Sequence, residues 1–211
     1  MLSLKEPKFI FVHINKCAGS SVNYSLRRVG HLKTRHEPLR LIQQKHEIDN
    51  LDDFFKFSFV RNPWSKMLSF YNYHANKRYW DLGWPWDRDN APEFKDFIKQ
   101  IYDPAFPWRK VFPKSRKRKS PVPIRVANSY DFLTDVSGEL NMDFIGRVEN
   151  MTEDFKFVRE KLGLVVKGPK CLNRSPKLKA HYSEYYDDES KELVAKFFSK
   201  DIEYFGYEFA E

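Results

Sequence analysis

The fold of this chain is decided by the stretch Phe9-Ile-Phe-Val-His-Ile-Asn-Lys16-Cys-Ala-Gly19-Ser20-Ser21. Its first half is a short apolar run rich in β-branched and aromatic residues, which predicts a buried strand over residues 8–14. The run then breaks into a tight turn, and apolar residues at helical spacing predict a helix over residues 20–29. A strand, a tight loop and a helix in this order aim backbone N–H groups at a phosphate.

The loop itself carries side chains that suit an anion. Lys16 supplies a mobile positive charge, Gly19 lets the backbone approach closely, and Ser20 and Ser21 can each donate a hydroxyl hydrogen bond. A Walker A loop needs its Lys directly after the last Gly, whereas Lys16 precedes Gly19 here. A kinase-like nucleotide-dependent phosphotransferase is therefore the weaker alternative. An ordinary strand–turn–helix corner without a ligand is the other interpretation.

A second segment repeats the arrangement. An apolar run predicts a strand over residues 55–60, and Asn62 and Pro63 then suit the cap and first position of a helix over residues 63–77. Arg61 thus follows the carboxyl end of a strand, where ligands bind in open α/β sheets, and its planar fork suits a terminal phosphate. Ser69 lies about two turns into the helix. A capping Arg and a core-facing Ser are the alternatives.

The two segments together resemble the carbohydrate-type sulfotransferases (sulfotransferase family 2-like), whose loop reads roughly His-Ile-Pro-Lys-Thr-Ala-Gly-Thr-Ser. This chain departs from that signature at Asn15 and Cys17. The resemblance implies a 3′-phosphoadenosine-5′-phosphosulfate (PAPS) donor, the product adenosine 3′,5′-bisphosphate, and a hydroxyl acceptor, here expected to be a carbohydrate. It also implies that Arg61 and Ser69 bind the 3′-phosphate, and that the loop surrounds the 5′-phosphosulfate through Lys16, Cys17, Ala18, Gly19, Ser20 and Ser21.

The resemblance extends along most of the chain. Residues 143–155 look like the family's late strand and following helix, and residues 172–175, 182–189 and 201–207 look like its C-terminal part. These later segments report the fold more than the site. Arg174 and Ser175 are weaker candidates for the 3′-phosphate.

Sulfuryl transfer depends mostly on positioning and on stabilising charge on the leaving phosphate. Lys16 can neutralise the bridging oxygen of the donor, so we expect no metal requirement. A general base must accept the proton of the acceptor hydroxyl. His36 lies between the two motifs, where the family commonly places its base, and Pro38 at the head of a helix leaves His36 at the turn before it. The alternatives are His46, Glu37 and Glu47.

Two further histidines and a cysteine have other expected roles. His13 matches the loop signature of the family and is expected to be structural, and His74 is expected at the surface. A thiol beside Lys16 and a helix N-terminus would make Cys17 a candidate nucleophile. A cysteine phosphatase loop has Cys-x-x-x-x-x-Arg, but Cys17 is followed at those positions by Val22 and Asn23. This alternative is therefore weak.

Composition indicates one globular domain over residues 1–211, with a core supplied by 19 Phe, 11 Tyr and 5 Trp. The two cysteines form no disulfide framework, and neither a leader nor an apolar run of about 20 residues is present. The expectation is a cytoplasmic protein without an integral membrane segment, or a lumenal one if the chain has been trimmed. Nothing in the sequence indicates its oligomeric state.

The net charge of +8 suits a polyanionic donor, an anionic acceptor or nucleic acid. No zinc-finger spacing or RNA-recognition signature is present, so a nucleic-acid partner is not expected. A basic run at residues 110–119 lies within a proline-rich surface insertion at 102–125, which either attracts an anionic acceptor or is a solvated tract. Aromatic residues 79–86 either stack on sugar rings or form a lid. A non-catalytic polyanion binder is the remaining alternative function.

The fold class follows from the alternation of elements. Nearly continuous apolar strands at 8–14, 55–60 and near 142–147 predict a mainly parallel sheet covered by helices on both faces, a P-loop-like α/β fold. The helices expected in addition to those at 20–29 and 63–77 cover residues 38–46, 92–101, 150–162 and 188–199.

Overall fold

The computed structural model describes residues 1–27, 29, 32, 34, 36–75, 90–106, 127–165, 168 and 180–210. The chain divides into two compact units. The first contains Met1–Arg61 and Ser129–Arg174, and the second contains Asn62–Asn128 and Ser175–Glu211. Each unit is described by itself below.

The first unit is built on a four-stranded sheet with strand order β1-β2-β3-β4. Strands β2, β3 and β4 are parallel, whereas β1 pairs antiparallel with β2. The strands are β1 (Leu2–Ser3), β2 (Phe9–Val12), β3 (Phe55–Val60) and β4 (Phe144–Arg147). The predicted mainly parallel α/β sheet is thereby confirmed. Strand β1 was not predicted, because two residues are too few to show a period.

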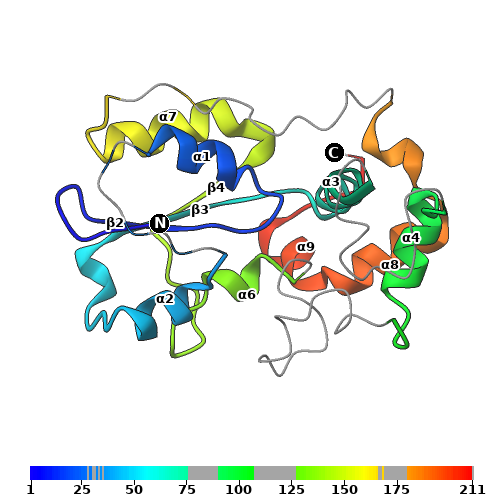
Figure 1. Ribbon diagram of the computed structural model, residues 1–211, viewed down its shortest axis with the longest axis horizontal. Helices are drawn as coiled ribbons and strands as arrows, with labels where there is room; N and C mark the ends of the chain where they lie inside the picture. Colours follow the sequence, from blue (N-terminus) through cyan, green and yellow to red (C-terminus); the bar gives the residue numbers. More distant parts are fainter. Residues whose placement is uncertain are drawn as a thin grey trace. The chain divides into compact units, whose positions relative to one another are not determined.

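Helices cover both faces of this sheet. Figure 1 shows α1 (Gly19–Ser25) and α7 (Met151–Lys161) on one face, and α2 (Leu39–Lys45) and α6 (Tyr130–Leu133) on the other. The predicted helices at 38–46 and 150–162 agree with α2 and α7 to within one residue at each end. Helix α1 ends four residues before the predicted limit, and α6 was not predicted.

Aromatic side chains of the strands form the core beneath α1 and α7. Phe11 stacks on Phe57 with ring centroids 5.1 Å apart, and Phe59 contacts Phe155 of α7 at 6.5 Å. All four rings are at most 1% exposed. Buried aromatic residues of this size dominate the energy of a core, so strand pairing and helix docking are stabilised together. The core fixes where the strands end, and therefore where the loops after them meet.

The second unit is helical in the part that the structure describes. Its elements are α3 (Pro63–Ala75), α4 (Phe94–Ile101), the 3₁₀-helix η6 (Tyr182–Tyr185), α8 (Asp188–Phe197) and α9 (Ser199–Phe205). Asn62 caps α3 as predicted, because its Oδ1 accepts from the N–H groups of Trp64 and Ser65 at 3.1 and 3.3 Å. Asp187 caps α8 in the same way, accepting from the N–H of Ser190 at 2.9 Å.

A buried ion pair lies inside the second unit. The Nζ of Lys66 on α3 lies 3.8 Å from Oδ2 of Asp201 on α9, and both side chains are at most 2% exposed. The same Nζ donates to the carbonyl of Ala127 at 3.1 Å and lies 4.8 Å from the centroid of the Phe198 ring. The pair therefore joins helices that are far apart in the sequence.

Two predicted surface segments fall mostly outside the described residues. These are the aromatic residues 79–86 and the basic run at 110–119 within the insertion at 102–125. Among the described residues, no helix is both long and apolar enough to cross a bilayer.

Candidate active site

The turn between β2 and α1 is the centre of the candidate site. Lys16 and Ala18 in this turn have left-handed backbone, with φ 62° and φ 54°. Such a conformation costs about 1–3 kcal/mol at a non-glycine residue, and strained residues of this kind cluster at ligand-binding loops. The surrounding fold therefore holds the backbone of this turn in a conformation that non-glycine residues rarely adopt.

Backbone N–H groups at the start of α1 are the first feature that suits an anion. The N–H groups of Ser21 and Val22 donate to the carbonyl of Ala18, at 2.8 and 3.2 Å. Within the part of the chain that the structure describes, the N–H groups of Gly19 and Ser20 donate to no other group. Two neighbouring N–H groups at the start of α1 are thus available to an oxyanion.

The side chains of the loop differ in exposure. Lys16 is half-buried and Ser20 is exposed, whereas Ser21 and Cys17 are buried. At 1% exposure the Cys17 thiol has no access to solvent. A nucleophilic cysteine needs at least partial exposure, so the structure gives no support to a thiol enzyme.

Arg61 lies against this loop. The parallel pairing of β2 with β3 brings the carboxyl ends of the two strands to one edge of the sheet. There, Nη1 of Arg61 donates to the carbonyl of Lys16 at 3.4 Å, although the two residues are 45 positions apart in the sequence. The structure therefore brings the two predicted motifs together at the edge where α/β sheets bind ligands.

His36 also reaches this edge, where it contacts His13 just after β2. The Nδ1 of His36 lies 3.1 Å from the carbonyl oxygen of His13, and the two ring centroids are 4.0 Å apart. His36 itself has left-handed backbone, with φ 48°, in the turn that precedes α2. The predicted base is thus held beside the loop that contains Lys16.

His13 is fixed in turn by a residue of α1. The Nδ2 of Asn23 lies 3.1 Å from Nδ1 of His13. Burial lowers the pKa of His13 well below its ordinary value, and the charges of His36 and of the N-terminal amine lower it further. The sequence assigned His13 a structural role and did not predict Asn23 as part of the site.

The ring of His13 leaves no room for a side chain at position 19, so this position needs glycine. A Cβ atom added at Gly19 would lie 1.9 Å from Cδ2 and 2.1 Å from Nε2 of His13. The Gly19→Ala variant is therefore expected to lose about 1–3 kcal/mol of unfolding free energy, because the ring must leave its place to make room for the methyl group. Urea denaturation of both proteins measures the difference.

Gly168→Ala is the matched control, since a Cβ there meets no described atom within 4 Å. Its stability should stay within about 0.5 kcal/mol of the wild type. Adding His13→Ala to Gly19→Ala should recover part of the loss. A double variant that loses the full sum of the two single effects would show that the contact with the ring is not the cause.

The structure separates His36 from the other proposed bases. His46 follows the last residue of α2, on the way to the amino end of β3, and its Nε2 is buried without a described hydrogen-bond partner. Glu37 accepts a hydrogen bond from Nζ of Lys45 at 3.0 Å. Glu47 is exposed, in the turn after α2. Among these candidates, and within the part of the chain that the structure describes, only the side chain of His36 forms a hydrogen bond with the turn after β2.

Other predicted residues remain untested. Ser69 lies on α3 in the second unit and is half-buried. The side chain of His74 and the residues Arg174 and Ser175 lie outside the described part of the structure.

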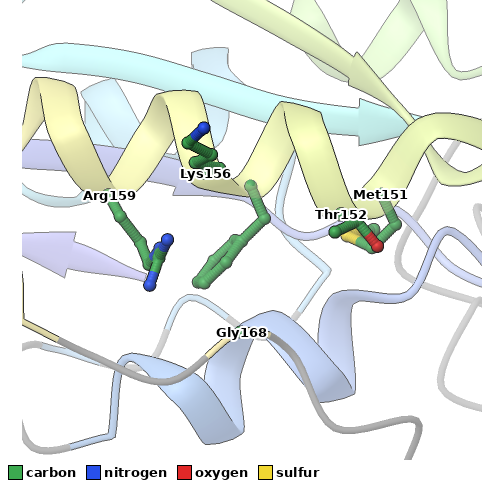
Figure 2. Close-up of a pocket in the computed structure, with 6 residues that line it drawn as sticks. Met151, Thr152, Lys156, Arg159 and Gly168 are labelled. Atoms are coloured by element: carbon green, nitrogen blue, oxygen red, sulfur yellow. The ribbon is translucent and has the colours of Figure 1, made fainter.

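A pocket of about 210 Å³ lies beside α7 and was not predicted. Figure 2 shows Lys156 and Arg159 on the helix and Gly168 opposite them. Its remaining lining residues are Met151, Thr152 and Phe155. The two cations make its rim positive, while Phe155 belongs to the buried core.

The chain is similar to a known protein family over most of its length. The model of a family described as "Sulfotransferase family" matches residues 2–208. An uncharacterized protein of Archaeoglobus fulgidus is 32% identical over 115 residues, which cover 54% of this chain and 71% of that protein. No solved structure matches the chain.

Proposed function

This chain belongs to the sulfotransferase family, and we propose that it transfers the sulfuryl group of PAPS to a hydroxyl of a carbohydrate. The observation that carries the proposal is the contact between Arg61 and the carbonyl of Lys16. This contact places the guanidinium of Arg61 beside a loop in which the backbone N–H groups of Gly19 and Ser20 are available to a ligand. A donor with phosphate at two separate positions needs both features at one edge of the sheet.

Each group at the site has a distinct part in binding the donor. The N–H groups of Gly19 and Ser20 and the hydroxyl of Ser20 suit the oxygens of the 5′-phosphosulfate. Arg61 suits the 3′-phosphate, since a guanidinium binds a phosphate through two parallel hydrogen bonds. Ser69 is proposed to bind the same 3′-phosphate, because its distance from Arg61 in the sequence matches the pattern of the family.

The transfer step uses Lys16 and His36. The acceptor oxygen forms a bond to sulfur while the bond between sulfur and the 5′-phosphate oxygen breaks, and the electron pair of that bond goes to the leaving phosphate. Lys16 stabilises the charge that develops on this phosphate, and His36 takes the proton that the acceptor hydroxyl loses. The protein thus supplies one cation and one base, and we propose no metal in this step.

A carbohydrate acceptor is supported by the loop signature and by the net charge of +8, which attracts anionic glycans. The acceptor is identified by incubating the protein with radiolabelled PAPS and a panel of glycans, both neutral and anionic. Incorporation of label into one class of glycan would identify that class as the acceptor. Incorporation into none, with intact binding of adenosine 3′,5′-bisphosphate, would refute the carbohydrate assignment.

Arg61→Ala is expected to weaken the binding of adenosine 3′,5′-bisphosphate by about 1.5–3 kcal/mol, the usual contribution of a hydrogen bond to a charged group. Affinity for adenosine 5′-phosphate should change much less, because this ligand lacks the 3′-phosphate. Calorimetric titration of both ligands measures the difference.

Arg40→Ala is the matched control. The Nη1 of Arg40 also donates to a backbone carbonyl of the first unit, that of Asp131 at 2.9 Å. Its affinity for both ligands should equal that of the wild type. If the wild type binds the two ligands equally well, the assignment of Arg61 is wrong, and a non-specific polyanion binder becomes the better description.

A further inference from the structure

The neighbouring rings of His13 and His36, tilted by 49° to each other, are held by several contacts. His36 contacts the main chain of His13, the ring of His13 contacts Asn23, and the same ring fills the space beside Gly19. Every one of these contacts lies within the first unit. They connect the proposed base to the loop that contains Lys16.

The contact of His36 determines where its proton lies. The carbonyl oxygen of His13 can only accept a hydrogen bond, so Nδ1 of His36 at 3.1 Å must carry a hydrogen. In the neutral ring the other nitrogen, Nε2, then holds the lone pair. A general base needs this lone pair to accept a proton from substrate.

The contact of His13 determines the opposite arrangement. The amide nitrogen of Asn23 can only donate, so Nδ1 of His13 at 3.1 Å accepts. The hydrogen of a neutral His13 therefore lies on Nε2. Burial lowers the pKa of His13 well below its ordinary value, and His36 and the N-terminal amine lower it further when they are protonated, so this ring stays neutral.

Steric contact holds the ring of His13 in place. Its Cδ2 and Nε2 occupy the volume that a Cβ at Gly19 would need. The ring of Phe11 stacks on it with ring centroids 5.9 Å apart, and the tilted ring of His36 lies close by, with ring centroids 4.0 Å apart. A ring locked on one side by α1 and the loop is a rigid surface against which His36 is oriented.

We propose that His13 is a positioning residue for sulfuryl transfer, whose carbonyl fixes the proton of His36 on Nδ1 and whose locked ring holds His36 with Nε2 ready to act as the base. The proposal rests on the proposed function, because the base acts on the acceptor hydroxyl. It adds a role for His13 and Asn23. It also predicts, whatever the acceptor is, that the two neighbouring rings carry their hydrogens on opposite nitrogens.

The first test is spectroscopic and needs no acceptor. A long-range proton–nitrogen correlation spectrum of protein with isotope-labelled histidine distinguishes the two tautomers of a neutral imidazole. His36 is expected with its hydrogen on Nδ1 and His13 with its hydrogen on Nε2. The His36→Gln and His13→Phe variants assign the signals by removing them. A hydrogen on Nε2 of neutral His36 would overturn the proposal.

The second test separates positioning from binding. His13→Ala and Asn23→Ala are expected to lower kcat about 10- to 100-fold, by analogy with the loss of residues that orient metal-binding histidines. The affinity for adenosine 3′,5′-bisphosphate should stay within about two-fold, because neither side chain is a proposed donor ligand. His13→Phe should retain more activity than His13→Ala, since it keeps a flat ring against His36.

The outcomes of the two tests distinguish failure of the proposal from failure of the proposed function. Wild-type kcat in His13→Ala, with the bisphosphate bound normally, would overturn the positioning role and leave the sulfotransferase assignment intact. Absence of sulfuryl transfer in the wild type would refute the proposed function, and the tautomer spectrum would still decide the arrangement of protons. Because bisphosphate binding reports a folded loop, a variant that fails to fold is recognised, and His13→Phe then replaces His13→Ala.

Discussion

Replacement of His36 by alanine is expected to lower the kcat of sulfuryl transfer about 10²- to 10⁴-fold, the usual contribution of a general base. The acceptor hydroxyl must lose its proton as the bond to sulfur forms, and His36 is the proposed base held beside the loop of Lys16. Affinity for adenosine 3′,5′-bisphosphate should be nearly unchanged, because a base acts in the transition state. Initial rates and calorimetric titration measure the two quantities on the same preparation.

His46→Gln is the matched control for this experiment, since His46 was the other histidine proposed from the sequence. It should keep the kcat of the wild type, because no hydrogen bond among the described residues links its side chain to the turn after β2. Wild-type turnover in His36→Ala would contradict the assignment of the base. Loss of turnover in His46→Gln alone would transfer the role to His46.

Asp201→Asn is expected to lower the free energy of unfolding by about 3–5 kcal/mol, the usual cost of removing one partner from a buried ion pair. Asp201 is 0% exposed, and the variant keeps its shape while removing its charge. The ammonium of Lys66 then stays buried beside Ala127 and Phe198 with no opposite charge at the 3.8 Å separation that the structure shows. Urea denaturation followed by circular dichroism measures the loss.

Two further variants show whether the lost charge is the cause. Lys66→Met combined with Asp201→Leu removes both charges, and its stability should lie above that of Asp201→Asn, because no unpaired charge remains. Lys95→Ala breaks an exposed pair with Glu93 at 4.0 Å and should cost less than about 1 kcal/mol. A loss in Asp201→Asn as small as that of Lys95→Ala would mean that water reaches the buried pair.

The regular elements could be predicted where one local signal dominates. Strand β3 was predicted with its observed limits, because aromatic and β-branched residues at 55, 57, 59 and 60 lead into Arg61-Asn62-Pro63. Asn62 was likewise identified as the cap of α3 from its own side chain. Helix α9 was not predicted as a separate helix, because the break at Phe198 has no glycine or proline to mark it.

Only part of the site could be predicted, because local sequence patterns do not encode contacts between turns that are distant in the chain. Lys16 and Arg61 were identified because each follows a strand, and parallel strands bring such residues to one edge. The contact between His13 and His36 joins two turns that lie 23 residues apart, and no local pattern encodes it. One feature of the sequence could have indicated the position of the His13 ring. Gly19 follows His13 by six residues, and a bulky ring packed against a tight turn requires a residue without Cβ there.

The hydrogen bond from Asn23 to His13 has a consequence for how the protein can be produced. Asn23-Tyr24-Ser25 is an acceptor sequence for N-linked glycosylation. The nitrogen to which the sugar would be attached is the same Nδ2 that lies 3.1 Å from the imidazole. A chain glycosylated there before folding would carry a bulky glycan where α1 packs against the ring, so it cannot reach the structure described above. Expression through a secretory pathway would therefore yield two populations that differ in mass, and only the lighter one would fold.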